Sequence, residues 1–203
     1  MSWTEQGDNA RNVRSYALRN QDETVWIDPV DPGADLDKIL ALGSPTHVLV
    51  TTGAHDRAAV AVAQRYKAQL WVPVGGTLWL AGADHQYGDG AALPAGLTAL
   101  RLDGGTMGDS VLHGRLAGLV IAFLGDSVIC VEKAKASWLM RCLFIWRAGV
   151  FQRNRFFIGG NRRKARASLQ QLRALKLDMA FVTHGEAVIG LADESLAESL
   201  ASW

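Results

Sequence analysis

The chain of 203 residues has only two cysteines, Cys130 and Cys142, and they do not form a CxxC pair. This argues against a disulfide framework, and we expect two inert, reduced thiols in a cytoplasmic protein. The longest apolar run, residues 119–124, is too short to cross a bilayer, which needs about 20 residues. The first residues carry no apolar run behind their charges, so we expect no signal peptide. Walker, glycine-rich dinucleotide and serine-nucleophile motifs are also absent from the sequence.

The bulk composition is that of a folded globular protein. Hydrophobic residues make up 49% of the chain and charged residues 20%, which excludes a disordered chain. The length favours one domain, and no repeat or linker divides the sequence. We therefore predict a single domain over residues 1–203.

Acidic residues are missing from one long segment. Residues 133–176 contain twelve of the 21 Lys and Arg residues and no Asp or Glu, which leaves nine bases and 20 acids elsewhere. Aromatic residues are interleaved with these bases, namely Trp138, Phe144, Trp146, Phe151, Phe156 and Phe157. The simplest interpretation is that the aromatic residues belong to the core and the bases form a solvated face, or that the segment forms a contact in a homodimer. The next interpretation is that the segment binds an anionic small molecule. Nucleic acid is disfavoured because the net charge is only +1.

The first third of the chain alternates strands and helices. Strands are predicted at residues 13–19 and 24–28, and further strands at 47–51 and 69–73. Helices are predicted around residues 35–42 and 57–67, where apolar residues recur at spacings of three and four. The stretch from 75 to 108 is rich in glycine and less regular.

The second half predicts a hairpin and a terminal α/β unit. Two apolar runs, residues 119–124 and 127–132, flank a Gly-Asp pair, which is typical of a β-hairpin. A helix over 162–175, a strand over 178–183 and a last helix capped by Asp193 follow.

Three stretches together resemble the metallo-β-lactamase superfamily. They are Thr24-Val-Trp-Ile-Asp28-Pro29, then Val48-Leu-Val-Thr51 followed by Thr52-Gly-Ala-His55-Asp56-Arg57, and finally the helix, strand and His184-Gly185 near the end. The order and spacing match over nearly the whole chain. The resemblance implies an αββα four-layer sandwich, with two mixed sheets flanked by helices and the site at the strand ends.

The sequence departs from the family at its HxHxDH metal motif. The three histidine positions are held by Thr52, Ala54 and Arg57, and only the aspartate, Asp56, is kept. A two-zinc site needs several neutral imidazoles and carboxylates, whereas a guanidinium is permanently charged and pairs with carboxylates itself. The resemblance therefore implies a divergent member in which a salt-bridged cluster replaces the metals.

Two motif positions have alternatives. The third-motif histidine position falls on Arg115, directly before the strand leading into the predicted hairpin, or on Gly105; we favour Arg115. The family's bridging aspartate matches the letters of Gly125-Asp126. Glu132 is favoured over Asp126, because choosing Asp126 would leave a β-rich apolar run as a site loop.

The predicted cleft consists of His55, Asp56, Arg57, Arg115, Glu132 and His184, with no catalytic residue assigned. Each residue also has a structural interpretation: Asp56 can cap the following helix, and His55 can be a solvated loop residue.

Two functional hypotheses follow. The first is a metal-free protein that binds an anionic small molecule or a partner through the Arg and carboxylate cleft, with no cofactor. The alternative is a mononuclear hydrolase of an ester, amide or phosphoester, in which Asp56, Glu132 and His184 hold one Zn or Fe ion and a bound water attacks.

Overall fold

Successive apolar side chains along a strand of this chain point to opposite faces of the sheet and pack against the layers on either side. In β3 (Glu23–Ile27), Val25 and Ile27 face the space between two sheets, and Trp26 faces the helices outside. All three are fully buried, which is the pattern of a strand covered on both faces. The computed structural model describes residues 1–4, 13–76, 80–105, 107–130, 152–153, 161–190 and 192–201.

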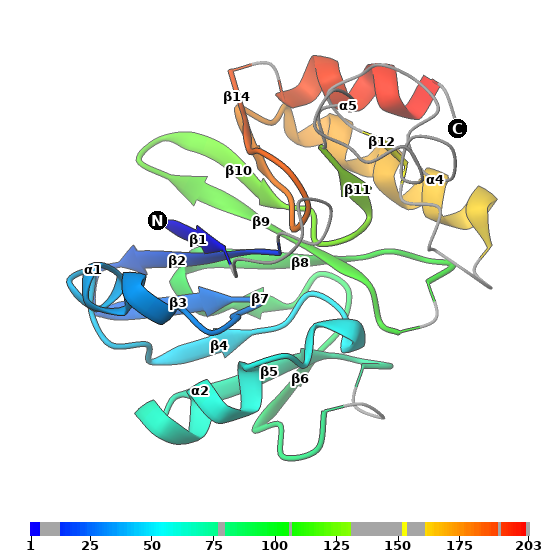
Figure 1. Ribbon diagram of the computed structural model, residues 1–203. Coiled ribbons are helices and arrows are strands. Elements are labelled where there is room, and N and C mark those ends of the chain that lie inside the picture. Colours follow the sequence, from blue (N-terminus) through cyan, green and yellow to red (C-terminus); the bar gives the residue numbers. More distant parts are fainter. Residues whose placement is uncertain are drawn as a thin grey trace, which may run out of the picture.

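Two six-stranded sheets form the centre of the molecule (Figure 1). The first has the order β1-β2-β3-β4-β5-β6, and the second the order β14-β13-β10-β9-β8-β7. Besides β3, the first contains β1 (Ser2–Thr4), β2 (Arg14–Asn20), β4 (His47–Leu49), β5 (Gln69–Pro73) and β6 (His85–Tyr87). The second contains β7 (Ala92–Leu93), β8 (Leu97–Arg101), β9 (Ser110–Leu116), β10 (Leu119–Phe123), β13 (Met179–Phe181) and β14 (Val188–Ile189).

Helices cover the outer faces of both sheets, as Figure 1 shows. The first sheet carries α1 (Leu36–Leu40) and α2 (Ala59–Tyr66), and the second carries α4 (Arg162–Leu172) and α5 (Ala192–Ala201). Short 3-10 turns are η1 (Gly33–Asp35), η2 (Gly53–His55), η3 (Pro94–Gly96) and η5 (Arg173–Leu175), and β11 (Val128–Ile129) pairs with β12 (Gln152–Arg153). The predicted αββα sandwich is confirmed. Among the described helices, none is both long enough and apolar enough to span a membrane.

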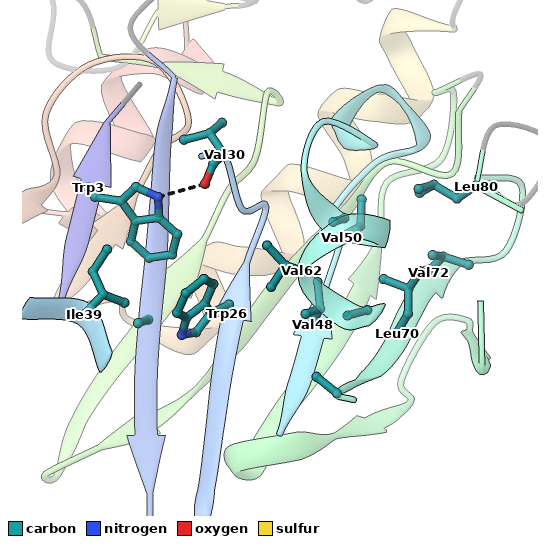
Figure 2. Packing of buried hydrophobic residues seen from close by; sticks show 14 residues of the cluster. Trp3, Trp26, Val30, Ile39, Val48, Val50, Val62, Leu70, Val72 and Leu80 are labelled. Atoms are coloured by element: carbon teal, nitrogen blue, oxygen red, sulfur yellow. Dashed lines mark hydrogen bonds between the residues drawn. The ribbon is translucent and has the colours of Figure 1, made fainter. Parts of the chain in front are cut away.

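Three apolar clusters fill the spaces between the layers. Figure 2 shows the one between the first sheet and its helices, where the Trp3 and Trp26 rings meet edge to face at 5.1 Å. The indole Nε1 of Trp3 donates to the Val30 carbonyl at 3.1 Å, so the polar atom of the buried Trp3 ring has a hydrogen-bond partner. A second cluster lies between the sheets, and a third lies under α4 and α5.

Strand directions place several strand ends at one edge. In the first sheet β3, β4 and β5 run parallel, and in the second β10 runs parallel to β13. The carboxyl ends of parallel strands share an edge of their sheet, which is where open α/β sheets bind ligands.

The predicted hairpin over residues 119–132 is wrong. β10 pairs with β9 on one side and with β13 on the other, so both of its edges are occupied. The following β11 pairs with β12 instead. Gly125-Asp126 is therefore a turn at the end of a central strand, and it leaves the sheet at the edge described above.

Candidate functional site

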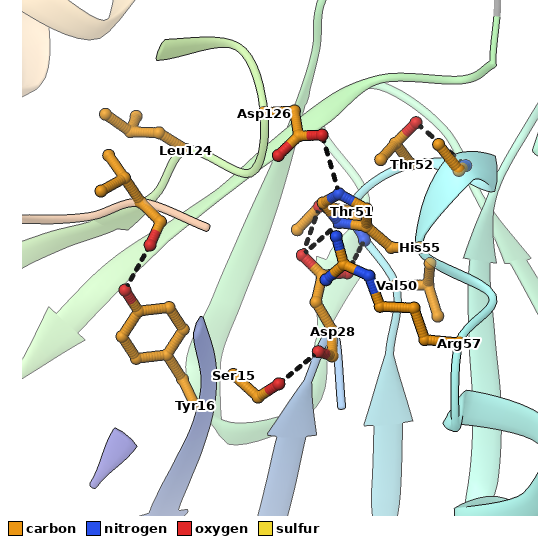
Figure 3. Close-up of polar contacts among 12 residues, drawn as sticks. Ser15, Tyr16, Asp28, Val50, Thr51, Thr52, His55, Arg57, Leu124 and Asp126 are labelled. Carbon is orange, nitrogen blue, oxygen red and sulfur yellow. Dashed lines mark hydrogen bonds and ion pairs between the residues drawn. The ribbon is translucent and has the colours of Figure 1, made fainter. Parts of the chain in front are cut away.

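Polar side chains from both sheets gather where these strands end. We call them the strand-end cluster, and they lie in the connections after β3, β4, β10 and β13 and before β9. The cluster comprises Asp28, Thr51, Thr52, His55, Arg57, Asp109, Asp126 and His184. Figure 3 shows most of them in close-up.

Asp28 is the anchor of the cluster on the first sheet. It follows β3 with a left-handed φ of 46°, which Asp tolerates better than most residues. Its carboxylate accepts the Thr51 backbone N–H at 2.8 Å and the Thr51 hydroxyl at 2.6 Å. The hydroxyl of buried Ser15 donates to the Asp28 carbonyl at 2.6 Å. These bonds fix a buried carboxylate in one orientation.

The η2 turn carries His55 into the interior. Thr52 precedes this turn, and its hydroxyl oxygen accepts from the Ala54 backbone N–H. The turn closes with a bond from the His55 N–H to the Thr52 carbonyl at 2.9 Å. As a result the His55 side chain is only 1% exposed, while Ala54 and Asp56 on either side of it are exposed.

The imidazole of His55 lies between two carboxylates. Its Nδ1 is 2.9 Å from Asp28 Oδ2, and its Nε2 is 3.0 Å from Asp126 Oδ2 (Figure 3). Burial lowers the pKa of His55, but the two carboxylates outweigh burial and raise the pKa to about 9. At neutral pH the ring is therefore an imidazolium that pairs with a carboxylate from each sheet.

Asp126 provides the contact from the second sheet. Burial raises the pKa of its carboxyl, but His55, His184 and Arg57 together hold that pKa well below its usual range. The turn before it requires glycine: Gly125 has a φ of 54°, and a Cβ there would lie 2.6 Å from Thr51 Oγ1. This close approach brings Asp126 against the loop after β4.

His184 and Arg57 complete the charges around Asp126. His184 follows β13, and its Nε2 lies 3.5 Å from Asp126 Oδ1, with both side chains 25% exposed. The partly buried Arg57 points its guanidinium toward Asp28, His55 and Asp126 in Figure 3. Its Nη1 is buried and has no hydrogen-bond acceptor among the described residues. A buried guanidinium donor without an acceptor is an unusual feature in a folded protein.

Asp109 is a member of the cluster that the sequence analysis missed. The loop before β9 packs on the loop after β4 through bonds from the Gly53 N–H to Met107 O and from the Ser110 N–H to Thr51 O, both 2.9 Å. This packing lets the Asp109 carboxylate accept a hydrogen bond from Thr52. Burial raises the pKa of Asp109, and that hydrogen bond opposes the shift.

Solved structures with the same fold cover nearly the whole chain. The DIM-1 metallo-β-lactamase superposes with a TM-score of 0.67 at 13% identity, covering 98% of this chain and 89% of that chain. TTHA1623 in a di-iron-bound form gives 0.67 at 17% identity, covering 96% and 98%. ETHE1 from Myxococcus xanthus gives 0.62 at 18% identity, covering 98% and 80%.

The chain has the metallo-β-lactamase fold. The resemblance noted in the sequence is thereby confirmed at the level of the fold. No protein-family profile and no curated protein sequence matches the chain, which agrees with the low identities to the solved structures.

The residues at the HxHxDH positions of this fold do not converge as metal ligands. Ala54 is exposed and has no donor atom, and Arg57 brings a positive charge. Asp56 is also exposed, and its carboxylate accepts the Arg57 backbone N–H at 2.8 Å. The buried histidine of the motif region is instead His55, at an intervening position.

Arg115 does not belong to the cluster, so its predicted place is wrong. β9 runs away from the cluster, from Ser110 to Leu116, and Arg115 lies near its far end. The exposed guanidinium contacts the Gly118 carbonyl at the turn between β9 and β10, at 3.4 Å. Glu132 lies outside the described residues, so its role remains a prediction, whereas Asp126 lies within the cluster. Most of the basic segment at residues 133–176 also lies outside them.

A two-metal centre does not fit these donors. In the part of the chain that the structure describes, no three His, Cys, Asp or Glu side chains are placed to share a metal ion. Both ring nitrogens of His55 face carboxylates, and the two cations His55 and Arg57 stand among the oxygens that a metal would need. A positive side chain within that shell repels a metal ion.

Proposed function

We propose that this chain is a metal-free protein of the metallo-β-lactamase fold, which binds an anionic small molecule at the strand-end cluster and does not hydrolyse a substrate at a metal centre. One observation carries the proposal: the carboxylates Asp28 and Asp126 are already paired with the protein's own cations. A metal would have to displace a buried imidazolium and approach a guanidinium, and both steps cost free energy.

Arg57 supports the anionic ligand. Its Nη1 is buried and lacks an acceptor among the described residues, and a carboxylate or phosphate oxygen is the acceptor that a guanidinium binds best. His184 lies on the partly exposed side of the cluster, next to Asp126. An anion that contacts Arg57 would gain a charge-assisted hydrogen bond, which contributes roughly 1.5–3 kcal/mol.

The alternative function, a mononuclear hydrolase of an ester, amide or phosphoester, requires Asp56, Glu132 and His184 to hold one Zn or Fe ion. Asp56 is exposed, and its carboxylate is bonded to the neighbouring backbone. This geometry favours the binding function over the hydrolase. The solved structures with metals are similar to this chain in fold only.

The test combines metal analysis with ligand binding. Protein purified without chelator and without a histidine tag is analysed for zinc and iron, and its melting temperature is then measured with small carboxylates, phosphates and their neutral amide analogues. We expect far less than one equivalent of metal, and stabilisation by anions only.

Matched arginine variants locate the binding site. Arg57→Gln should weaken binding of the best anion roughly 10- to 100-fold in calorimetry, which corresponds to about 1.5–3 kcal/mol. Arg115→Gln makes the same chemical change at the far end of β9 and should bind like the parent protein. One equivalent of zinc or iron that survives dialysis and is lost in His184→Ala would support the hydrolase instead.

A further inference from the structure

The guanidinium of Arg14 has an acceptor for each of its three nitrogens. Arg14 is the first residue of β2 in the first sheet, and its side chain is 21% exposed. Its Nε donates to the Gly185 carbonyl at 3.1 Å, its Nη2 to Glu186 Oε1 at 2.8 Å and its Nη1 to Ser2 Oγ at 3.2 Å. Because every nitrogen is engaged, this arginine holds protein groups together and is not arranged to receive an anion.

Two of these acceptors belong to the loop that carries His184. We call residues 183–186 the His184 loop, and it follows β13 in the second sheet. The backbone N–H of Arg14 donates to the Thr183 carbonyl at 2.8 Å, and Val13 and His184 form an antiparallel bridge. The main chain and the side chain of Arg14 therefore contact the loop before and after His184, from a strand of the opposite sheet.

Cys130 supports the same loop through a second set of bonds. Its backbone N–H donates to the His184 carbonyl at 2.9 Å, and its carbonyl accepts the Glu186 N–H at 3.2 Å. Gly185 has a φ of 106°, and the Cys130 carbonyl leaves no room for a Cβ there. Main-chain bonds thus fix the path of the loop, and the Arg14 side chain adds a charge-assisted hydrogen bond at the residue directly after His184.

The His184 loop sets the place of the imidazole at the strand-end cluster. His184 Nε2 lies 3.5 Å from Asp126 Oδ1, and both side chains are 25% exposed. The cluster is therefore open to solvent at His184, whereas the ring of His55 is buried. A side chain that contacts a ligand needs neighbours that hold it in the productive position, and for His184 these neighbours act on its backbone.

We infer that Arg14 is a positioning residue of the strand-end cluster, which reaches from the first sheet and holds the His184 loop so that the imidazole faces Asp126 and the bound anion. The inference rests on the proposed function, because that function supplies the anion. It adds a residue that acts on the site through the backbone of its neighbour. It also gives two arginines different roles: Arg57 binds the anion, and Arg14 positions His184.

Matched variants separate positioning from general stability. Arg14→Met keeps the length of the side chain and removes all its donors, whereas Glu186→Gln removes only an ion pair whose carboxylate is 69% exposed and contributes little. The proteins are labelled on histidine and compared below their melting temperatures, without ligand, by nitrogen-15 and proton NMR of the rings. We expect Arg14→Met to shift or broaden the His184 ring signals and to leave those of His47, at the start of β4, unchanged. Glu186→Gln should match the parent protein at both rings.

Arg14→Lys is the second variant, because it keeps one charged donor and most of the side-chain length. It should shift the His184 signals less than Arg14→Met does. The His184 signals are assigned by their loss in His184→Gln. His184 signals that stay in place in both Arg14 variants would overturn the inference, since a merely structural arginine would lower the melting temperature without moving this ring.

Binding of inorganic phosphate, measured by calorimetry, supplies an independent readout. Arg14→Met should weaken phosphate binding no more than His184→Ala does, and the double variant should bind as His184→Ala does, because Arg14 acts through His184. Losses of affinity that add in the double variant would also overturn the inference. A parent protein that binds neither phosphate nor another small anion would contradict the proposed function instead, and the His184 signals would still decide the role of Arg14.

Discussion

The stability of this protein should fall as the pH rises from about 6.5 to 9, because of one buried side chain. The pKa of His55 is raised from 6.5 to about 9 in the folded protein. A raised pKa means that the folded state binds the proton more tightly than the unfolded state. The resulting stability is fully present below the unfolded pKa and is lost as the pH passes through the folded pKa. One pKa unit corresponds to about 1.36 kcal/mol, so the loss should amount to about 3 kcal/mol.

Urea unfolding at pH values between 6 and 9.5 measures this loss, with His55→Gln as the reference. The variant has no group to titrate at this position, so the difference between the two proteins isolates the contribution of His55. This subtraction also removes the effect of the Met1 amino group, whose pKa burial lowers and which therefore favours the folded state as the pH rises. A difference in unfolding free energy that stays constant from pH 6.5 to 9 would show that His55 is not an imidazolium between two carboxylates.

Three further outcomes are expected. Gly125→Ala should lower the unfolding free energy by about 1–3 kcal/mol in urea titrations. The reason is that Gly125 has a positive φ and that a Cβ there would lie 2.6 Å from Thr51 Oγ1. An unchanged urea midpoint would show that this close approach does not exist. Arg57→Ala should destabilise the fold by about 1–3 kcal/mol, because the Arg57 charge stabilises the Asp126 carboxylate. Arg115→Ala should stay within about 0.5 kcal/mol, and equal melting temperatures of the two variants would show that the Arg57 charge does not stabilise Asp126. Residues 133–176 carry twelve bases and no acid, and the rest of the chain carries more acids than bases. We therefore expect light scattering to show a homodimer at low salt that dissociates as the salt concentration rises. A monomer that binds single-stranded RNA or DNA tightly and in a salt-sensitive way would contradict this expectation.

Several strands and helices could be predicted from local patterns in the sequence, whereas the four-layer arrangement was implied by the resemblance to the metallo-β-lactamase superfamily. Strands expected at residues 24–28, 47–51 and 69–73 correspond to β3, β4 and β5. The helix expected at 57–67 corresponds to α2. The strand at 47–51 was indicated by a continuous β-branched run, and the helix at 57–67 by apolar residues at spacings of three and four.

The pairing of strands was less predictable, because partners lie far apart in the sequence. Two apolar runs around Gly125-Asp126 have the local signature of a hairpin, but β10 pairs with β9 and β13. The hairpin interpretation also underlies the preference for Glu132 over Asp126, because choosing Asp126 would have left a β-rich apolar run as a site loop. Arg115 was misplaced for a related reason: a residue pattern does not reveal which end of a strand reaches the cluster.

The central histidine illustrates a different limit. Counting positions in the HxHxDH motif shows that Ala54 and Arg57 stand where the family has metal-binding histidines. The direction of each side chain, however, depends on the backbone of the η2 turn. His55, at an intervening position, turns inward and meets Asp28 and Asp126. The sequence analysis predicted that cations of the chain replace the metals, and this stays a proposal. Which carboxylates contact His55 could be seen only in the structure.

Nitrogen-15 NMR of the histidine side chains tests the central claim most directly. Protein labelled on histidine is observed near pH 7.5 before and after addition of Zn²⁺, and the His55 signals are assigned by their loss in His55→Gln. The structure predicts a ring with protons on both nitrogens, because each nitrogen faces a carboxylate oxygen, and signals that Zn²⁺ leaves unchanged. A neutral ring at this pH, or a ring nitrogen that exchanges its proton for Zn²⁺, would contradict the account.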